Sequence, residues 1–224
     1  MSEAEFAILR DVMMREITLS TSQTSEQTGK SELDERVMQA IGQLPRHEFV
    51  PLELKAYAYL NTPLPIGHGK TVSQPFIVAL MTDLLAPGPE DTVLEIGTGL
   101  GYQAALLGRL TQKVYTLELN EDLAEQATKR LKALDCGNVE VRVGDGNQGL
   151  PQFAPYDKIM VTAAPDLIPP PLLGQLKPGG RMVIPTGLME SQQLLLVEKS
   201  PEGKYQTTEI LPVRFSSLDQ AEYY

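Results

Sequence analysis

The sequence predicts an α/β fold built on a mainly parallel β-sheet with helices on both faces. Strand-like runs alternate with helical segments from Thr92 to about residue 177, which is the pattern of a parallel sheet. The stretch VLEIGTGLGYQAALLGRL has the strand, glycine turn and helix order of a nucleotide-binding loop. The last strand-like runs follow one another without helices, so we expect an antiparallel edge at the C-terminal end of the sheet.

The composition is that of a globular protein with one sizeable core. The chain has 224 residues, 42% of them hydrophobic, and a net charge of -10, which makes a nucleic-acid backbone an unfavourable partner. Cys136 is the single cysteine, so no intrachain disulfide can form and we expect a reducing, cytoplasmic setting. The start MSEAEF lacks an apolar signal segment, and no run of about 18 apolar residues predicts a membrane span.

The first part of the chain alternates between helical and polar segments. Residues 3–15 have the apolar spacing of a short amphipathic helix. Residues 18–30 are rich in Ser, Thr and Gln with almost nothing to bury, so we expect a flexible loop there. Ser31 to Asp34 resemble a capping box that opens the next helix, and Pro45 would end that helix.

These segments suggest a division of the chain into two parts. We expect an N-terminal helix and flexible polar segment over residues 1–30, followed by a single domain over residues 31–224. Within that domain, residues 31–88 would form a helical substrate and active-site region, and residues 89–224 the cofactor-binding sheet.

The elements of the sheet region follow from local patterns. A helix is expected over about residues 74–85, and a second, clearer one over residues 121–135, with Asn120 as its N-cap and Gly137 at its end. The expected strands are Thr92–Ile96, Lys113–Leu119, Val139–Val143, Lys158–Thr162, Arg181–Pro185, Leu194–Val197 and Tyr205–Val213.

The glycine loop is the main candidate for a ligand site. Gly97, Gly99 and Gly101 let the backbone turn sharply and let a ligand approach it closely. Glu118 stands at the end of the next expected strand, where a carboxylate meets ribose hydroxyls in nucleotide-binding α/β folds. A structural glycine turn without a ligand is the alternative interpretation.

The loop favours one class of nucleotide. Its spacing is G-x-G-x-G with Tyr102 next, which differs from the dinucleotide fingerprint, and no Walker lysine follows. Glu95, just before the first glycine, would oppose a pyrophosphate but suit a ligand that carries an ammonium and a sulfonium. Both departures favour S-adenosylmethionine over NAD.

Two later stretches bear on the same ligand. Asp145, in VGDG, would lie beside an adenine and could accept a hydrogen bond from its exocyclic amine, although Asp-Gly is also an ordinary turn pair. Thr162 to Pro165 read TAAP, which differs from the Asn/Asp-Pro-Pro-aromatic sequence of N6-adenine methyltransferases. Charge and this stretch together argue against methylation of RNA or DNA.

Taken together, these pieces resemble the protein-L-isoaspartate (D-aspartate) O-methyltransferases over about residues 31–215. TVSQP after PIGHG is much more specific to this family than the glycine loop. The matching stretches are LPRHEFVP (44–51), LPIGHGKTVSQPFIVALMTDLL (64–85), VLEIGTGLGYQAALL (93–107), NVEVRVGDG (138–146), YDKIMVTAAP (156–165) and LKPGGRMVIPTG (176–187).

The resemblance implies a Rossmann-like, seven-stranded methyltransferase fold with S-adenosyl-L-methionine as cofactor. The acceptor would be the α-carboxylate of L-isoaspartyl residues, and of D-aspartyl residues as well, in damaged proteins or peptides. The methyl ester would collapse to a succinimide, whose hydrolysis returns some normal aspartate. The implied partners are isoaspartyl proteins or peptides, and we expect a monomer without a metal.

The resemblance also implies roles for individual residues. Ser73 takes the position of the active-site serine. Phe215 and Ser216 belong to the segment that would fold back over the cofactor and substrate, and would contact the substrate together with Ser73. His68 is close to Ser73 in sequence, so it could also contact the substrate, or it could be only a loop residue. The implied cofactor-binding residues are Thr71, Val72, Gln74, Glu95, Gly97, Thr98, Gly99, Gly101, Gln103, Glu118, Leu119, Asp145, Gly146 and Thr162.

The sequence departs from the family pattern in two places. Ser216 and Ser217 follow the C-terminal RF, where family members usually have Val-Pro, and residues 18–30 lengthen the link after the first helix. Both changes bear on the acceptor more than on the cofactor. A carboxyl methyltransferase for another peptide or small molecule, and a cofactor-binding protein without turnover, are the alternatives.

The expected chemistry needs orientation more than acid–base catalysis. A carboxylate with a pKa of about 4 is already a nucleophile at neutral pH. His47 is expected at the surface beside a proline turn, without a catalytic role. Ser73 precedes an apolar helix, so it could be only an N-cap, or it could bind the acceptor carboxylate together with free N–H groups of that helix.

Overall fold

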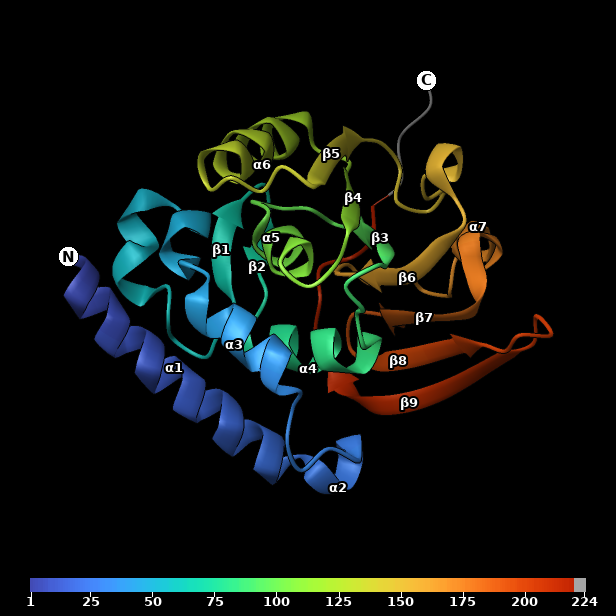
Figure 1. The fold of residues 1–224 in the computed structure, drawn as a ribbon, viewed down its shortest axis with the longest axis horizontal. Helices are drawn as coiled ribbons and strands as arrows, with labels where there is room; N and C mark the ends of the chain where they lie inside the picture. Colours follow the sequence, from blue (N-terminus) through green and yellow to red (C-terminus); the bar gives the residue numbers. More distant parts are fainter. Residues whose placement is uncertain (220–224) are drawn as a thin grey trace.

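The computed structural model describes residues 1–219, and they form an α/β fold around a seven-stranded sheet (Figure 1). The strand order is β5-β4-β3-β6-β7-β8-β9. The strands β5, β4, β3, β6 and β7 run parallel to one another, whereas β8 is antiparallel to β7 and β9 is antiparallel to β8. The predicted antiparallel C-terminal edge is therefore confirmed. The strands are β3 (Thr92–Ile96), β4 (Lys113–Glu118), β5 (Val139–Val143), β6 (Tyr156–Val161), β7 (Leu176–Thr186), β8 (Gln192–Lys199) and β9 (Tyr205–Val213).

Each predicted strand is present, but β7 is longer than the sequence pattern indicated. It begins at Leu176, which pairs with Tyr156 of β6 across an irregularity in the register. The Pro-Gly-Gly run of residues 178–180 has the composition of a loop. Gly180 nevertheless lies in the strand, where a Cβ would meet the Asp157 carbonyl oxygen at 2.8 Å.

Helices cover both faces of the sheet, as predicted. The helices are α1 (Glu3–Gln23), α2 (Ser25–Thr28), α3 (Glu35–Gln43), α4 (Pro75–Leu85), α5 (Tyr102–Gly108), α6 (Glu121–Ala133) and α7 (Pro170–Gln175). One face packs against α4 and α5 through residues such as Leu80 and Leu107, and the other packs against α7 through Leu172. A small hairpin of β1 (Leu64–Gly67) and β2 (Lys70–Val72) stands beside the main sheet.

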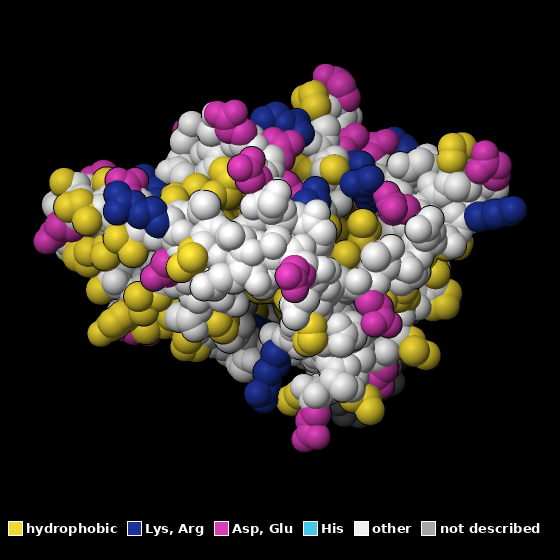
Figure 2. Space-filling model, turned by 90° about the horizontal axis from the view of Figure 1, so that it is seen from below, with side chains coloured by type: hydrophobic (Ala, Val, Ile, Leu, Met, Phe, Trp, Pro, Cys, Tyr) yellow, Lys and Arg dark blue, Asp and Glu magenta, His cyan; other side chains and the backbone are white. Residues whose placement is uncertain are grey.

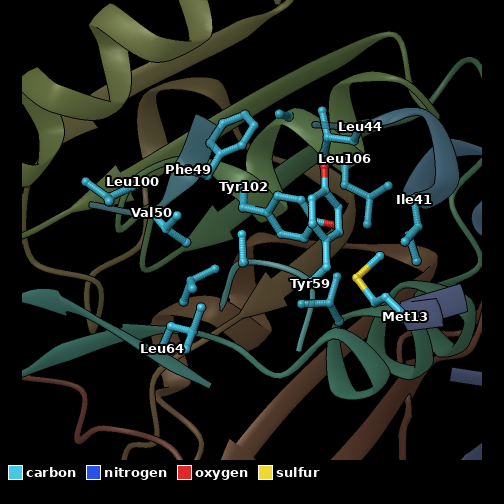
Figure 3. Packing of buried hydrophobic residues seen from close by; sticks show 14 of the residues in the cluster. Met13, Ile41, Leu44, Phe49, Val50, Tyr59, Leu64, Leu100, Tyr102 and Leu106 are labelled. Atoms are coloured by element: carbon cyan, nitrogen blue, oxygen red, sulfur yellow. The ribbon is translucent and has the colours of Figure 1, made fainter. Parts of the chain in front are cut away.

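The N-terminal helix shares the core of the rest of the chain. Met13 and Ile17 of α1 are fully buried and belong to one cluster with Ile41, Tyr59 and Tyr102 (Figure 3). The cluster also takes in apolar residues of α5 and α6. Burial of an aliphatic side chain stabilises a fold by about 1.5–3 kcal/mol, so α1 is held by its apolar face.

The flexible loop predicted for residues 18–30 is wrong for most of its length. α1 continues to Gln23 and α2 spans Ser25–Thr28, with Gly29 at a φ of 67° after it. The hydroxyls of Thr18, Thr21 and Thr24 bond to carbonyls four residues earlier, so these polar side chains are satisfied within the helix.

The segment after α2 is fixed by a buried carboxylate. Asp83 of α4 pairs with Lys30, at 2.8 Å between Nζ and Oδ2, and accepts a bond from the Asp34 backbone N–H at 2.6 Å. Lys30 lies in the polar segment, whereas Asp83 lies in α4. The composition of the polar segment therefore does not predict this ion pair.

The helix starts and ends differ in detail from the predictions. Asp34 caps α3 by accepting from the Arg36 N–H, so the predicted capping role of Ser31 is wrong. Asn120 caps α6 through the Leu123 N–H at 3.0 Å, which confirms that prediction. The positive φ after α6 belongs to Asp135, at 55°, and not to Gly137.

His47 is buried, which corrects its predicted surface position. The exposed fraction of His47 is 4%, its ring stacks on Phe6 of α1 at 3.8 Å between centroids, and Nδ1 lies 2.8 Å from the Tyr59 hydroxyl. Desolvation by burial lowers the pKa of His47. Within residues 1–219, no helix combines the length and apolarity that crossing a membrane requires.

Candidate active site

A cavity of about 290 Å³ lies at the carboxyl ends of β3, β4 and β6. The glycine loop, the β1–β2 hairpin and the C-terminal segment after β9 enclose it. In open parallel sheets, this end of the strands is where ligands bind. The predicted site residues that line it are His68, Thr71, Val72, Ser73, Gly97, Thr98, Gly99, Gln103, Glu118, Leu119, Gly146, Thr162, Phe215 and Ser216.

The glycine loop requires glycine for its backbone and for space. Gly97 has a φ of 96°, and a Cβ built on it would lie 2.5 Å from Thr162 Oγ1 at the end of β6. That hydroxyl lies 2.8 Å from the Gly97 carbonyl oxygen, so it anchors the loop to the neighbouring strand. At Gly97 and Gly99, therefore, the backbone of the loop borders the cavity without a side chain of its own.

Glu118 holds the loop and faces the cavity at the same time. Its Oε2 accepts a bond from the Gly99 N–H at 2.8 Å, and its Oε1 accepts from the Asn120 N–H at 3.1 Å. Its side chain is largely buried, with a residue exposure of 7%. A carboxylate at this position fits the predicted contact with ribose hydroxyls.

Glu95 does not line the cavity, although it was predicted to be the anion that suits a cationic ligand. It is fully buried beneath the loop, where its Oε2 bonds to the Thr116 hydroxyl, and that hydroxyl lies 2.7 Å from Thr98 Oγ1. Burial raises the pKa of Glu95 to about 8. The side chain is therefore mostly neutral at pH 7, and it supports the loop from below.

Replacement of Glu95 by Gln should change the pH dependence of stability. Because the pKa of Glu95 rises from 4.5 to about 8 on folding, its contribution to the stability of the fold is intact below pH 4.5 and is lost as the pH rises to about 8. At pH 8.5 we expect the free energy of unfolding of Glu95→Gln to exceed that of the wild type by on the order of a few kcal/mol, and its melting temperature to be higher, with a smaller difference at pH 5. Thermal melts at the two pH values measure it, and an equal difference at both would contradict the assignment.

Three other predicted cofactor residues also lie outside the cavity lining. Gln74 and Gly101 are adjacent to it, and Asp145 precedes Gly146, which does line it. Asp145 Oδ1 accepts from the backbone and side-chain amides of Asn147, at 2.8 and 3.0 Å. This arrangement is an Asx turn, so the turn interpretation of Asp145 describes its local role.

Ser73 lines the cavity but does not cap α4. The N-cap residue is Gln74 without a side-chain cap, and the Phe76 N–H is bonded instead to Oδ1 of Asn61 at 3.0 Å. Pro75 has no N–H, so few helix amides are left for a ligand. Within the described part of the chain, the Ser73 hydroxyl makes no hydrogen bond, and the capping interpretation is wrong.

Asn61 connects the start of α4 to the end of α1. Its Nδ2 donates to Ser20 Oγ at 3.2 Å and its carbonyl oxygen accepts from Gln74 Nε2 at 3.0 Å. Asn61 could not be predicted from the sequence, because a cap that lies 15 residues from the helix start has no local signature.

Loss of the Asn61 cap should destabilise the fold. We expect Asn61→Ala to cost about 1 kcal/mol, and Asn61→Asp, which keeps the accepting Oδ1, to cost clearly less. Thermal melts of the two variants measure the difference. Equal melting temperatures for Asn61→Ala and the wild type would show that the cap contributes nothing.

Arg46 is a second residue that the sequence analysis missed. Its guanidinium is fully buried, with Nε donating to the Ala58 carbonyl at 2.8 Å and Nη2 to the Ser73 carbonyl at 2.7 Å. It also lies over the ring of Tyr102, at 4.7 Å from the centroid. Arg46 thereby fixes the backbone of Ser73, and its place in the stretch LPRHEFVP was the available signal.

The C-terminal segment closes one side of the cavity. The side chain of Gln192 holds Phe215 through both its backbone N–H, at 2.6 Å, and its carbonyl, at 3.1 Å. Ser216 accepts from the Ala164 N–H at 2.8 Å. Lys70 of β2 pairs with Asp219 at 2.5 Å, which joins the hairpin to the same segment.

Comparisons with known proteins agree on one family. A family model described as protein-L-isoaspartate(D-aspartate) O-methyltransferase matches residues 23–223. Protein-L-isoaspartate O-methyltransferase 1 of Polaromonas sp. strain JS666 is 58% identical over 99% of this chain and 94% of its own length.

Solved structures have the same fold. A protein-L-isoaspartate O-methyltransferase superposes with a TM-score of 0.74 and 29% identity, over 91% of this chain and 65% of its own. A Plasmodium falciparum protein in complex with S-adenosyl-L-homocysteine also gives a TM-score of 0.74, with 22% identity, over 90% of this chain and 98% of its own, a likeness that shows the fold.

Proposed function

Because the chain belongs to the protein-L-isoaspartate(D-aspartate) O-methyltransferase family, we propose that it methylates isoaspartyl residues of damaged proteins and peptides. The methyl group goes to the α-carboxylate, and D-aspartyl residues are a second acceptor. The ester then closes to a succinimide, and hydrolysis of that ring returns part of the material to normal aspartate. The observation that carries the proposal is the Ser73 hydroxyl, which lines the same cavity as the glycine loop and makes no hydrogen bond to any residue among 1–219.

The cavity suits S-adenosyl-L-methionine, the cofactor of this family. Gly97 and Gly99 leave a backbone cradle that a Cβ would fill, and Glu118 offers a carboxylate at the wall. Bound there, the cofactor supplies a methyl group activated by its sulfonium. We assign the ribose hydroxyls to Glu118, the adenine to Gly146, and the methionine part to Thr98 and Gln103. Of the assigned residues, Glu95, Gly101, Gln74 and Asp145 support the site from outside the lining.

The protein's part in the reaction is to bind and orient the acceptor. An isoaspartyl carboxylate has a pKa of about 4 and needs no general base. Ser73 would donate a hydrogen bond from its hydroxyl to one carboxylate oxygen, and the other carboxylate oxygen would remain free to accept the methyl group. Phe215 and Ser216 cover the acceptor side and exclude water, which strengthens the attraction between the anion and the cationic cofactor. His68 borders the same space, with Nδ1 3.2 Å from Asn120 Nδ2.

Several further properties are part of the proposal. We propose that the protein is a monomer and that it acts in the cytoplasm. The single cysteine supports a reducing compartment of this kind. We also propose that residues 31–88 serve the substrate and residues 89–224 the cofactor. Residues 1–30 are then an addition that packs on the same core through α1.

The repair outcome provides a direct test. An isoaspartyl peptide incubated with the protein and S-adenosyl-L-methionine should yield the normal aspartyl peptide over repeated cycles, as followed by liquid chromatography. Omission of the cofactor is the control. Turnover of the cofactor with another carboxylate, but without aspartyl peptide, would favour a different acceptor. Binding without any turnover would favour a silent scaffold.

A further inference from the structure

Arg46 is a fully buried cation that lies against the backbone of Ser73. Its Nη2 donates to the Ser73 carbonyl at 2.7 Å and its Nε donates to the Ala58 carbonyl at 2.8 Å. Its Nη1 is buried without a hydrogen-bond partner among residues 1–219. Desolvation lowers the pKa of the guanidinium, yet an arginine keeps its proton at neutral pH. A full positive charge therefore contacts the backbone of the proposed active-site serine.

No carboxylate in the described part of the chain compensates this charge. The ionisable groups that act on Arg46 are the hydroxyls of Tyr59 and Tyr102. Burial raises the pKa of both tyrosines, so both are neutral at pH 7. They belong to the apolar cluster of Figure 3, and the Tyr102 ring centroid lies 4.7 Å from the guanidinium carbon. An uncompensated ion in an apolar interior is costly, so Arg46 lacks a counter-charge that a bound anion could supply.

The protein surface offers an anion little other attraction. The chain carries a net charge of -10, and on the face seen in Figure 2 the Lys and Arg side chains are scattered among Asp and Glu. Lys70 lines the cavity, but it is already paired with Asp219 and this pair is partly exposed to solvent. Salt screens exposed charges strongly, whereas the charge of the buried guanidinium acts through a medium of low dielectric constant.

We propose that Arg46 is an electrostatic positioning residue, whose buried charge attracts the acceptor carboxylate to Ser73 and disfavours neutral acceptors. The proposal rests on the proposed function, because the isoaspartyl carboxylate is the anion that supplies the missing counter-charge. Arg46 does not line the cavity, so it acts across the backbone of Ser73 and not by contact. The methyl ester is neutral, so the same charge favours the acceptor over the product and promotes release of the ester.

The test measures the preference for a charged acceptor in a complex that cannot react. The protein is saturated with S-adenosyl-L-homocysteine, and two peptides are titrated by calorimetry. One is an isoaspartyl peptide, and the other has an α-carboxamide in place of its α-carboxylate. We expect Arg46→Gln to reduce the ratio of carboxamide Kd to carboxylate Kd by on the order of 10-fold, the attraction between unit charges at an effective dielectric constant of about 20. Arg46→Lys keeps the charge and should retain most of the ratio.

Two controls separate the charge of Arg46 from other effects. Arg10→Gln removes the same charge from a guanidinium that also lies over a ring, that of Tyr59, but is paired with Glu3. This variant should keep the wild-type ratio. In the wild type, the ratio should not fall when NaCl is raised from about 0.05 to 0.5 M, because a buried charge is screened little. A preference that came from the exposed Lys70 would fall over that range.

The outcomes separate this proposal from the proposed function. If Arg46→Gln weakens the binding of both peptides equally, or if Arg46→Lys loses as much of the ratio as Arg46→Gln, Arg46 only shapes the backbone of Ser73 and the proposal is wrong, although the enzyme assignment stands. A wild-type ratio that falls with salt would also contradict it. Arg46→Lys and the salt series decide the question even if Arg46→Gln does not fold. If the wild type methylates no isoaspartyl peptide, the proposed function itself fails.

Discussion

Gly97→Ala is expected to weaken cofactor binding by on the order of 100-fold. Gly97 has a φ of 96°, a region in which an L-side chain is strained, and its Cβ would lie 2.5 Å from Thr162 Oγ1. The loop can relieve both problems only by moving, and movement displaces the backbone groups that face the cavity. Titration calorimetry with S-adenosyl-L-homocysteine measures the change in Kd.

A matched glycine provides the control for this substitution. Gly174 lies in α7, where a Cβ would meet nothing within 4 Å, so Gly174→Ala should keep the wild-type Kd. Wild-type affinity in Gly97→Ala would show that the glycine loop is a structural turn only. That result would support the alternative in which the loop binds no ligand.

Ser73→Ala is expected to reduce kcat for an isoaspartyl peptide by about 10- to 100-fold, the effect of removing one hydrogen bond to a charged group. The expectation follows from the position of the hydroxyl, which lines the cavity and bonds to no described residue. Since Ser73 does not cap α4, the melting temperature should stay within about 1 °C of the wild type. Steady-state kinetics and a thermal melt measure the two quantities.

Asn61→Ala is expected to have the opposite pattern of effects. Asn61 carries the cap at the start of α4, so its loss should lower the melting temperature, whereas the loss of the Ser73 hydroxyl should lower turnover. If Ser73→Ala kept full turnover and only lowered the melting temperature, Ser73 would serve the stability of the fold and not the binding of the substrate. The Arg46 contact to the Ser73 carbonyl is unaffected by the substitution, because it involves the backbone.

Much of the fold was predictable because its signals are local. The alternation of strands and helices, the glycine loop and the Asn120 cap all depend on residues close together in sequence. Glu118 was predictable in the same way, since its place follows from the end of a strand. The family-specific stretch TVSQP predicted Ser73 as the active-site serine, and Ser73 does line the cavity.

The features that were not predictable depend on distant partners. Residues 18–28 are polar, yet they are helical because their hydroxyls bond within the helix and Asp83 anchors the segment that follows. Glu95 was predicted to be an anion that suits a cationic ligand because it stands beside the loop, but its strand is central in the sheet and buries it. The capping of α4 by Asn61 and the support of Ser73 by Arg46 likewise arise only in the folded chain.

The central claim is that the cavity joins a cationic methyl donor to an isoaspartyl carboxylate. It is tested most directly by labelled methyl transfer from S-adenosyl-L-methionine to two peptides that differ only in isoaspartate or aspartate at one position. We predict base-labile label on the isoaspartyl peptide and none on the aspartyl peptide. Label on neither peptide, with the cofactor still bound, or equal label on both, would contradict the claim.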